Sequence, residues 1–393
     1  MMSQPLELDV AIFGGGVAGL WTLARLIKQG FNAHLFECNQ LGAGQSIASQ
    51  GIIHGGTKYA LTGKITGASE AIREMPSIWS DCLSGKGELD LSAVKITSSH
   101  QLLWTQADLK SKVGGFFASK VMSSRMTKLD ATEIPEIFQH SDFKGTVYRL
   151  DEQVIDPTSL FENLFSQLED HLSFYESEQL DMNQGLNGEL HISGMQVNAK
   201  AIVLTAGEGN AELLHVLGCN EPAMQRRPLH MPMVKSKLLP QLTAHALGDG
   251  ALPRMTITAN HDLAGDVVWY LGGKIAEEGI EVSQEVLIQK AKDELTVMLP
   301  WVDWRSMEWS TVMLNRAEPL MSDGGRPDRP YIHSQKNILT AWPVKLAFAP
   351  LLAQEVLSEL ANIGIEPSHT SADVDLPKPS VAKLPWDEVA SWS

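Results

Sequence analysis

Three glycines near the N-terminus constrain the fold more strongly than any other feature of this sequence. The pattern Gly14-x-Gly16-x-x-Gly19 follows a short apolar run at residues 10–13 and precedes apolar residues at helical spacing. A buried strand that enters a tight turn and continues into a helix is the context that a dinucleotide-binding turn requires. The first glycine permits the turn, the second lets backbone approach a pyrophosphate, and the third lets the helix pack on the strand.

An acidic residue stands where such a fold needs one. Residues 33–36 predict a second strand, and Glu37 ends it eighteen positions after Gly19. A spacing of roughly 20 is expected for a carboxylate that binds the ribose, and the positive end of the first helix faces the phosphates. The sequence therefore predicts a dinucleotide site comprising Gly14, Gly16, Val17, Ala18, Gly19, Glu37 and Cys38.

Two further strand–turn–helix patterns lie far downstream. Residues 201–204 lead into Thr205-Ala206-Gly207 and a helix at 210–216, and residues 338–340 precede a helix at 351–360. The stretches between these patterns are rich in predicted strands bounded by turn residues. One discontinuous domain interrupted by a second domain is the arrangement that these separated signals favour.

The fold class predicted is therefore α/β, with a Rossmann-like dinucleotide-binding domain on a parallel sheet and a second, substrate-binding domain on a mixed or antiparallel sheet. The predicted boundaries assign residues 1–85, 150–222 and 312–370 to the first domain, 86–149 and 223–311 to the second, and 371–393 to an irregular tail.

Charge and composition exclude several classes of partner. With 31 basic and 47 acidic side chains, the net charge of −16 disfavours binding to nucleic acid or to an anionic membrane surface. The N-terminal residues lack the pattern of a secretory signal, and no apolar run reaches the length of a transmembrane segment. We therefore expect a cytoplasmic protein. Three widely spaced cysteines match neither a disulfide framework nor a zinc site, so no metal is predicted.

A resemblance to a known superfamily identifies the dinucleotide. The segment from Gln45 to Met75, QSIASQGIIHGGTKYALTGKITGASEAIREM, resembles the region after the ribose acid in FAD-dependent glycerol-3-phosphate dehydrogenases. In that family a serine-rich run is followed by I-H-G-G-x-[RK]-Y and then a helix. The segment is also similar to that of L-2-hydroxyglutarate oxidases, which share G-[VI]-I-H-x-G-x-x-Y. Both families belong to the D-amino-acid oxidase (DAO) superfamily.

Further matches to the superfamily are spread along the chain. They comprise Asp156 with Pro157 before a helix, the turn at 205–207, the runs 316–319 (RAEP) and 326–330 (RPDRP), and Lys345 with Leu346, which resembles the G-K-L of the glycerol-phosphate enzymes. Two departures are evident. The large C-terminal domain of the bacterial glycerol-phosphate enzymes has no counterpart, and residues 341–345 (AWPVK) replace the glycine-rich end motif of amine oxidases.

The resemblance implies non-covalently bound FAD. Residues 42–49 would run along the pyrophosphate and ribityl chain, although the same composition is also typical of an ordinary surface loop. The residues implicated in addition to the glycine turn are Gln45, Ser46, Ser49, Gln50, Gly51, Ala206, Gly207, Lys345 and Leu346.

Flavin-dependent oxidation transfers a hydride to the ring and a proton to the protein, so a substrate anchor and a base are needed. By resemblance, Lys58, Tyr59 and Arg316 hold the anionic group of the substrate. The alternatives are a solvated surface lysine for Lys58 and a structural salt bridge for Arg316.

His54 and His230 are the candidates for the base, because an imidazole can accept a hydroxyl proton near neutral pH. Each could instead be a structural histidine, and His54 could also attach the flavin covalently. Lys345, just before the last predicted helix, could stabilise the reduced flavin with its charge, or could be a surface lysine.

These features favour oxidation of a small anionic hydroxy compound, either a 2-hydroxy acid or a polyol phosphate. An amine or amino-acid oxidase of the same fold is the first alternative, and a non-catalytic flavin-binding redox protein is the second. Oxygen, a quinone and a carrier protein all remain candidates for the electron acceptor.

Overall fold

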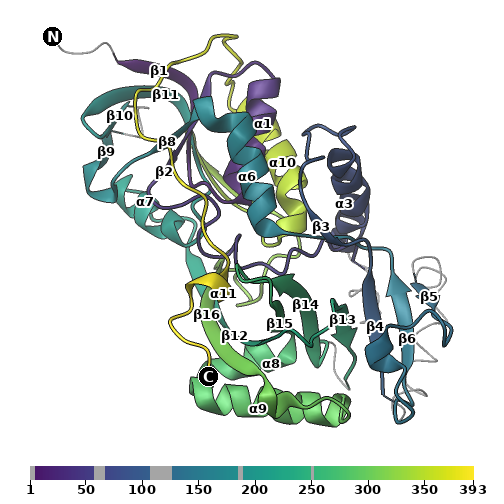
Figure 1. The fold of residues 1–393 in the computed structure, drawn as a ribbon. Coiled ribbons are helices and arrows are strands. Elements are labelled where there is room, and N and C mark those ends of the chain that lie inside the picture. The colour runs from purple at the N-terminus through teal and green to yellow at the C-terminus, as the bar shows by residue number, and fades with distance from the viewer. Residues whose placement is uncertain (1–4, 57–66, 107–125, 185–188, 249–251) are drawn as a thin grey trace.

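A computed structural model describes residues 5–56, 67–106, 126–184, 189–248 and 252–393. Lys58 and Tyr59 lie outside these ranges. The chain forms two units, each built on a sheet, which lie one above the other in Figure 1. None of the helices within the described ranges is long and apolar enough to cross a membrane.

The first sheet holds the glycine turn. Within the described residues it has eight strands in the order β17-β18-β11-β1-β2-β8, with β10 and β9 extending from β11. Strands β18, β11, β1, β2 and β8 are parallel, so their carboxyl ends meet at one edge. The bounds are β1 Leu6–Phe13, β2 Ala33–Glu37, β8 Leu172–Phe174, β9 Leu180–Gln184, β10 Glu189–Ile192, β11 Met195–Leu204, β17 Tyr331–Gln335 and β18 Ile338–Trp342.

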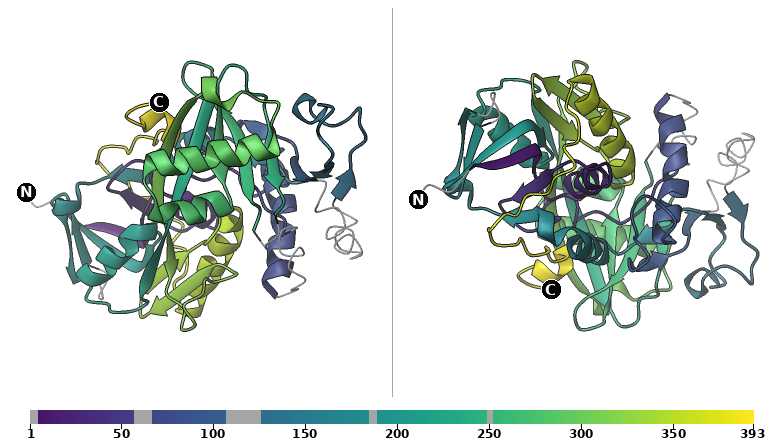
Figure 2. Two further views of the ribbon diagram at one scale, coloured as in Figure 1. Left: turned by 90° about the horizontal axis from the view of Figure 1, so that it is seen from below. Right: turned by 90° about the horizontal axis from the view of Figure 1, so that it is seen from above.

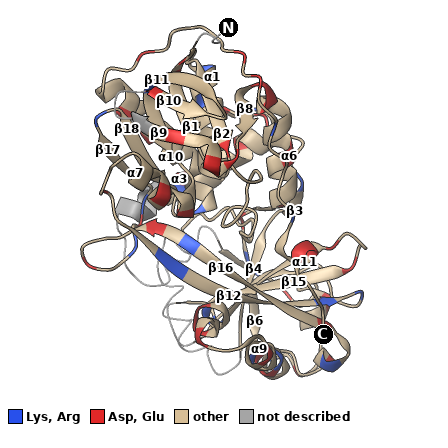
Figure 3. Cartoon of the chain, turned by 90° about the vertical axis from the view of Figure 1, so that its left-hand side faces the viewer, with Lys and Arg blue, Asp and Glu red and all other residues tan. Residues whose placement is uncertain are grey.

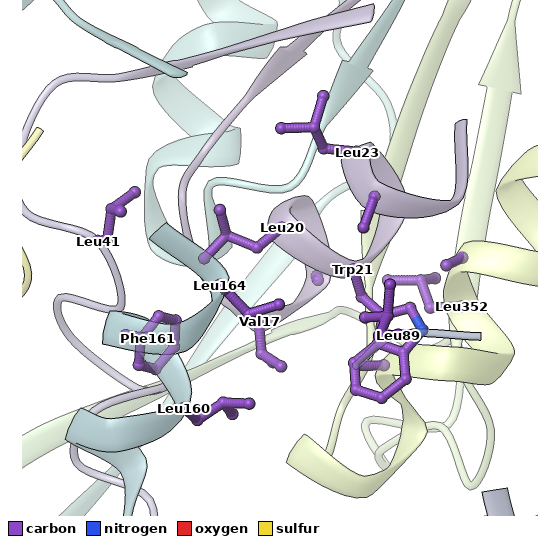
Figure 4. Close-up of a cluster of buried hydrophobic side chains, with 14 of the residues drawn as sticks. Val17, Leu20, Trp21, Leu23, Leu41, Leu89, Leu160, Phe161, Leu164 and Leu352 are labelled. Atoms are coloured by element: carbon purple, nitrogen blue, oxygen red, sulfur yellow. The ribbon is translucent and has the colours of Figure 1, made fainter. Parts of the chain in front are cut away.

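Helix α1 (Val17–Lys28) is buried between α6 (Pro157–Leu168) and α10 (Ala349–Asn362). Figure 4 shows its apolar side chains, among them Leu20 and Trp21, between those of α6 and α10, and Figure 2 shows α1 beside α10 from above. Helix α6 begins where the sequence places it, because Asp156 accepts a hydrogen bond from the Ser159 N–H at 2.7 Å. Helices α3 (Gly67–Leu83) and α7 (Asn210–Val216) complete the unit.

The second sheet is mainly antiparallel. In the described part of the chain it has eight strands in the order β16-β12-β15-β14-β13-β4-β6-β5, and only β13 and β4 pair in parallel. The bounds are β4 Gln101–Thr105, β5 Met126–Lys128, β6 Thr146–Leu150, β12 Met224–Ser236, β13 Thr243–Ala246, β14 Met255–His261, β15 Val267–Gly272 and β16 Glu308–Pro319. A separate pair joins β3 (Ile96–Ser98) to β7 (Val154–Ile155).

Alternation along the strands divides the second sheet into two buried faces. Trp269 and Leu271 of β15 pack in the core formed with helix α9 (Gln284–Met298), which lies across the sheet in Figure 2. Met231 of β12 and Tyr270 of β15 point the other way and share a core with the first unit. The Tyr270 face of the second sheet is therefore the face that packs against the first unit.

The remaining elements are short. They are α8 Lys274–Glu278, α11 Pro385–Glu388, and the 3-10 helices η2 Glu136–Phe138, η3 Glu169–His171, η4 Ser177–Gln179, η6 Gly207–Gly209, η7 Gly279–Glu281, η8 Trp304–Ser306 and η9 Leu346–Phe348.

Strand β16 differs from the boundary expected at residue 312. It pairs with β12 from Glu308 to Pro319, so residues 312–319 belong to the second sheet rather than to the first domain. The sequence signal there was the R-A-E-P run, which says nothing about strand partners. Continuous backbone pairing with β12 determines the position of this segment.

The C-terminal segment, residues 371–393, contains the short helix α11 and is closely packed. Leu41 donates to the Ser380 carbonyl at 2.8 Å, and Ser393 exchanges backbone hydrogen bonds of 2.8 and 2.9 Å with Trp309. Trp386 is buried, lies 5.5 Å from the Tyr270 ring and donates to the His261 carbonyl at 3.2 Å. The segment therefore fastens the first unit to the second (yellow in Figure 1).

Replacing Trp386 with Ala should destabilise the protein by about 3–5 kcal/mol, the usual cost of deleting a buried aromatic side chain. Denaturant unfolding of the purified protein measures this. Lys383→Ala, at an exposed position three residues earlier, is the matched control and should change the stability by less than about 0.5 kcal/mol. Equal stabilities for the two variants would contradict this account of the tail.

Candidate active site

The glycine turn and the Thr205-Ala206-Gly207 turn form one packed unit. Gly14 has φ +108°, and a Cβ there would lie 2.4 Å from the Ala206 Cα, so only glycine fits. A Cβ on Gly19 would lie 2.0 Å from the Gly14 carbonyl oxygen. The Thr205 hydroxyl donates towards the carbonyls of Phe13 and Gly14, at 3.1 and 3.0 Å. Two predicted cofactor segments almost two hundred residues apart are thereby held in contact.

Glu37 closes the other side of the turn. Its Oε2 accepts a hydrogen bond from the Gly15 N–H, and its Oε1 accepts one from the Asn39 N–H at 2.7 Å. Burial raises the pKa of the Glu37 carboxyl, and hydrogen bonds from the backbone of Gly15, Asn39 and Cys38 partly offset this effect. The carboxylate is thus fixed beside the glycine turn, and Cys38 follows it at the surface.

The turn has the donors that a pyrophosphate requires. Helix α1 begins after Gly16, which has no side chain to cap the helix, and the Val17 N–H donates to the Ser46 hydroxyl at 3.3 Å. Gly207 has φ +58°, and no described atom lies within 4 Å of where its Cβ would be. The N-terminus of α1, the Ser46 hydroxyl and the open space beside Gly207 fit the phosphates and sugars of a dinucleotide.

The 42–51 loop joins this cradle to the second sheet. Gln45 accepts a hydrogen bond from the Ala317 N–H at 3.0 Å, and Gln50 donates to the Tyr270 carbonyl at 3.2 Å. The Tyr270 hydroxyl donates to the Ala48 carbonyl at 3.2 Å. These contacts place the predicted cofactor residues Gln45 and Gln50 at the junction between the units.

Ser49 and Gly51 hold the end of the same loop. The Ser49 hydroxyl accepts from the Gly51 N–H at 3.4 Å. Gly51 has φ +65°, and a Cβ there would lie 2.0 Å from the Ile155 carbonyl oxygen. Glycine at this position therefore lets the loop lie directly against β7.

Arg316 lies on β16 next to Ala317 and forms a pair with Arg227, its register partner on β12. Its Nη1 donates to Glu277 at 3.3 Å, and Nη1 of Arg227 donates to the buried Glu318 at 3.2 Å. Burial, and secondarily the charge of Arg227, lower the pKa of Arg316. Figure 3 shows these basic and acidic segments together at the ends of β12 and β16 towards the first sheet.

The salt bridge that the sequence left open for Arg316 is thus present. It does not use the whole side chain, because Nη2 of Arg316 makes no hydrogen bond to any described residue. On β12 and β16, Arg227 and Arg316 alternate in phase with Leu229 and Leu314, which pack against the core shared with the first unit. The guanidinium pair therefore faces the flavin-binding unit.

The two candidate histidines have different environments. His230 is buried, with Nδ1 3.0 Å from the Gly279 carbonyl oxygen and Nε2 2.9 Å from the Thr311 hydroxyl. Both ring nitrogens of His230 thus have hydrogen-bond partners within the second unit, which favours a structural role for this residue. His54 follows the 42–51 loop, called the flavin loop below, and its Nδ1 lies 3.9 Å from the Glu152 carboxylate.

Lys345 precedes η9 and α10 at the carboxyl edge of the first sheet. Its Nζ lies 5.1 Å from the centre of the Phe348 ring, and Leu346 begins η9. The indole of Trp342 donates to the Gly207 carbonyl at 3.0 Å, which joins this segment to the cofactor turn. Val344 has φ +55°, a strained conformation for a β-branched residue, at the position of the glycine in G-K-L.

Sequence reasoning missed a set of buried polar residues next to His54. Glu152, Gln101 and His245 are all buried and hydrogen-bonded to one another in series. None lies in a run that resembles a known motif. Glu152 lies just after β6, a strand that the sequence had not predicted.

Comparison with known proteins agrees with this geometry. The family model described as FAD dependent oxidoreductase (DAO) matches residues 9–282. The chain belongs to the DAO family of FAD-dependent oxidoreductases. It is 44% identical over 388 residues to the probable FAD-dependent oxidoreductase PA4991 of Pseudomonas aeruginosa, covering 98% of this chain and 99% of that protein.

Solved structures of this family share the fold. The crystal structure of PA4991 matches with a TM-score of 0.86 at 40% identity, over 98% of this chain and 99% of that one. Glycine oxidase of Geobacillus kaustophilus matches with a TM-score of 0.60 at 16% identity, over 92% and 98%. L-alpha-glycerophosphate oxidase of Mycoplasma pneumoniae matches with a TM-score of 0.62 at 13% identity, over 97% and 99%.

For this FAD-dependent oxidoreductase, Glu37→Gln should weaken FAD binding roughly 10- to 100-fold, because a charged acceptor is lost. The raised pKa of Glu37 means that its ionised form disappears at a higher pH than the ordinary 4.5. The affinity of the wild type should therefore decrease as the pH falls towards that raised pKa, and that of Glu37→Gln should not. Flavin fluorescence titration measures both, with the exposed Glu7→Gln on β1 as control. Identical affinities and pH profiles would remove Glu37 from the FAD site.

Proposed function

We propose that this enzyme oxidises a small anionic hydroxy compound, either a 2-hydroxy acid or a polyol phosphate such as glycerol 3-phosphate. The observation that carries the proposal is the position of Arg316. It lies beside Ala317, which the flavin loop contacts through Gln45, and it shares its face of the sheet with Arg227. Glu318 and Glu277 balance the charge of the two guanidinium groups, so the anchor is the fork of Arg316, whose Nη2 makes no hydrogen bond to a described residue.

Bound FAD would accept a hydride from the substrate. The chain has to orient the substrate and remove a proton. Arg316 provides a planar fork for a carboxylate or phosphate, assisted by Lys58 and Tyr59 through their match to the glycerol-phosphate enzymes. His54 accepts the hydroxyl proton, and Lys345 at the start of α10 places positive charge near the cofactor.

An amine or amino-acid oxidase is the second candidate. The solved structures that share the fold carry names from both classes, glycine oxidase and glycerophosphate oxidase, at identities that support the fold alone. The I-H-G-G-x-K-Y run with His54 and the Lys345-Leu346 pair favour the hydroxy compound. Membership of an oxidoreductase family, together with the cofactor cradle, makes the protein an enzyme rather than a non-catalytic scaffold.

Anaerobic mixing of the FAD-loaded protein with panels of 2-hydroxy acids, polyol phosphates and amino acids should distinguish these candidates. We expect loss of the flavin absorbance near 450 nm, roughly its usual position for the oxidised ring, with a hydroxy compound and not with its uncharged analogue. Reduction by amines alone would overturn the proposal in favour of the second candidate.

Arg316→Ala should raise KM for the anionic substrate by roughly 10- to 100-fold and change kcat less, because a charge-assisted contact contributes about 1.5–3 kcal/mol. Arg305→Ala is the matched control. Arg305 is exposed in η8, on the α9 side of the second sheet, and this variant keeps both Arg227 and Arg316. Its KM should stay within about twofold of the wild type. The same KM in both variants would place the substrate anchor elsewhere.

A further inference from the structure

A series of buried polar side chains runs from His54 into the second sheet. The Glu152 carboxylate accepts from the Gly55 N–H at 2.8 Å and from Nε2 of Gln101 at 3.2 Å. Oε1 of Gln101 lies 2.6 Å from Nε2 of His245, and Nδ1 of His245 lies 2.9 Å from the Thr256 hydroxyl. Strands β4, β13 and β14 thus each contribute one member.

The chemistry of these groups fixes the direction of the series. The amide nitrogen of Gln101 donates to Glu152, so its oxygen is the atom that points to His245. The Gln101 oxygen needs a donor, so His245 carries its proton on Nε2. Nδ1 of His245 then accepts from the Thr256 hydroxyl.

His54 stands at the more exposed end of this series. Its Nδ1 lies 3.9 Å from Oε2 of Glu152, a distance for an ion pair rather than a hydrogen bond, and its side chain is 30% exposed while that of Glu152 is 7% exposed. Backbone contacts keep the two in register, because the Ile53 N–H donates to the Gln153 carbonyl at 2.9 Å and Ile52 forms a bridge with Val154. A carboxylate behind Nδ1 favours the tautomer with its proton on Nδ1, which makes Nε2 the nitrogen that carries the lone pair.

We propose that Glu152 is a positioning residue for His54, and that Gln101 and His245 hold the carboxylate in place. The inference rests on the proposed function, in which His54 is the base. The proton of the substrate hydroxyl passes to Nε2 of His54, and the negative charge of Glu152 compensates the positive charge that the ring gains. The same arrangement of carboxylate, imidazole and reacting hydroxyl serves as a proton acceptor on unrelated folds.

The first test requires no substrate. Long-range ¹H–¹⁵N spectra of the FAD-loaded protein, labelled with ¹⁵N-histidine, report which ring nitrogen carries the proton. We expect the proton on Nδ1 in His54 and on Nε2 in His245, with the signals assigned by His54→Gln and His245→Gln. A proton on Nε2 of His54, with Nδ1 bare, would overturn the inference.

The second test uses Glu152→Gln. The new amide places an N–H₂ donor where an acceptor stood, so His54 should change to the tautomer with its proton on Nε2. With a substrate found in the panel, kcat should fall roughly 10- to 100-fold while KM stays within about twofold, the reverse of the pattern for Arg316→Ala. Glu152→Asp keeps the carboxylate and should restore the wild-type tautomer and part of kcat.

Asp9→Asn is the matched control for loss of a buried carboxylate. Asp9 is as buried as Glu152 but lies on β1 away from the glycine turn, where Lys200 and Ser368 contact it. Its removal should lower stability and leave the His54 tautomer unchanged. An unchanged His54 tautomer in Glu152→Gln would refute the role of Glu152. If the wild type shows the predicted tautomers but His54→Gln keeps the wild-type kcat, the result would refute His54 as the base instead.

Discussion

The contact between the Gly14 turn and Thr205-Ala206-Gly207 is the constraint on which the rest of the structure depends. No side chain separates the two backbones, because a Cβ at Gly14 would fall 2.4 Å from the Ala206 Cα. This contact aligns the carboxyl ends of β1 and β11, whose last paired residues are Phe13 and Leu204. The cofactor edge of the first sheet is therefore formed by segments that are distant in sequence and share one tightly packed point.

The second constraint is the set of hydrogen bonds that hold residues 42–55 against the second sheet. Gln45, Gln50 and the Ala48 carbonyl all bond to strands of that sheet rather than to the cofactor cradle alone. The loop is thus held by both units. The polar residues that it carries to the junction are therefore fixed in position relative to both sheets. A site between two units needs such a shared segment, because otherwise the substrate groups of one sheet would move relative to the cofactor held by the other.

Charge at this junction is balanced locally rather than by the protein as a whole. Arg227 and Arg316 would repel each other in isolation, and Glu318 and Glu277 offset that repulsion. On the far side, Glu152 places a negative charge behind His54. The proposed reaction needs the anion-binding Arg316 of β16 and the proton-accepting His54 to reach one substrate molecule from different elements. This separation is what oxidation of a molecule with a charged group next to a hydroxyl requires.

Local sequence determined the elements and the dinucleotide turn, and a family resemblance identified the dinucleotide as FAD. The glycine turn, Glu37, and the helices at 210–216 and near 351–360 follow from apolar spacing, caps and φ requirements, which act within a few residues. Strand partners were a different matter, and β16 was divided wrongly at residue 312 because pairing with β12 is a long-range contact. The same limit applied to the site. His54 and His230 could not be ranked from sequence, since the groups that distinguish the two imidazoles are Glu152 beside one and Gly279 and Thr311 beside the other. Only the tertiary structure brings those groups to the rings.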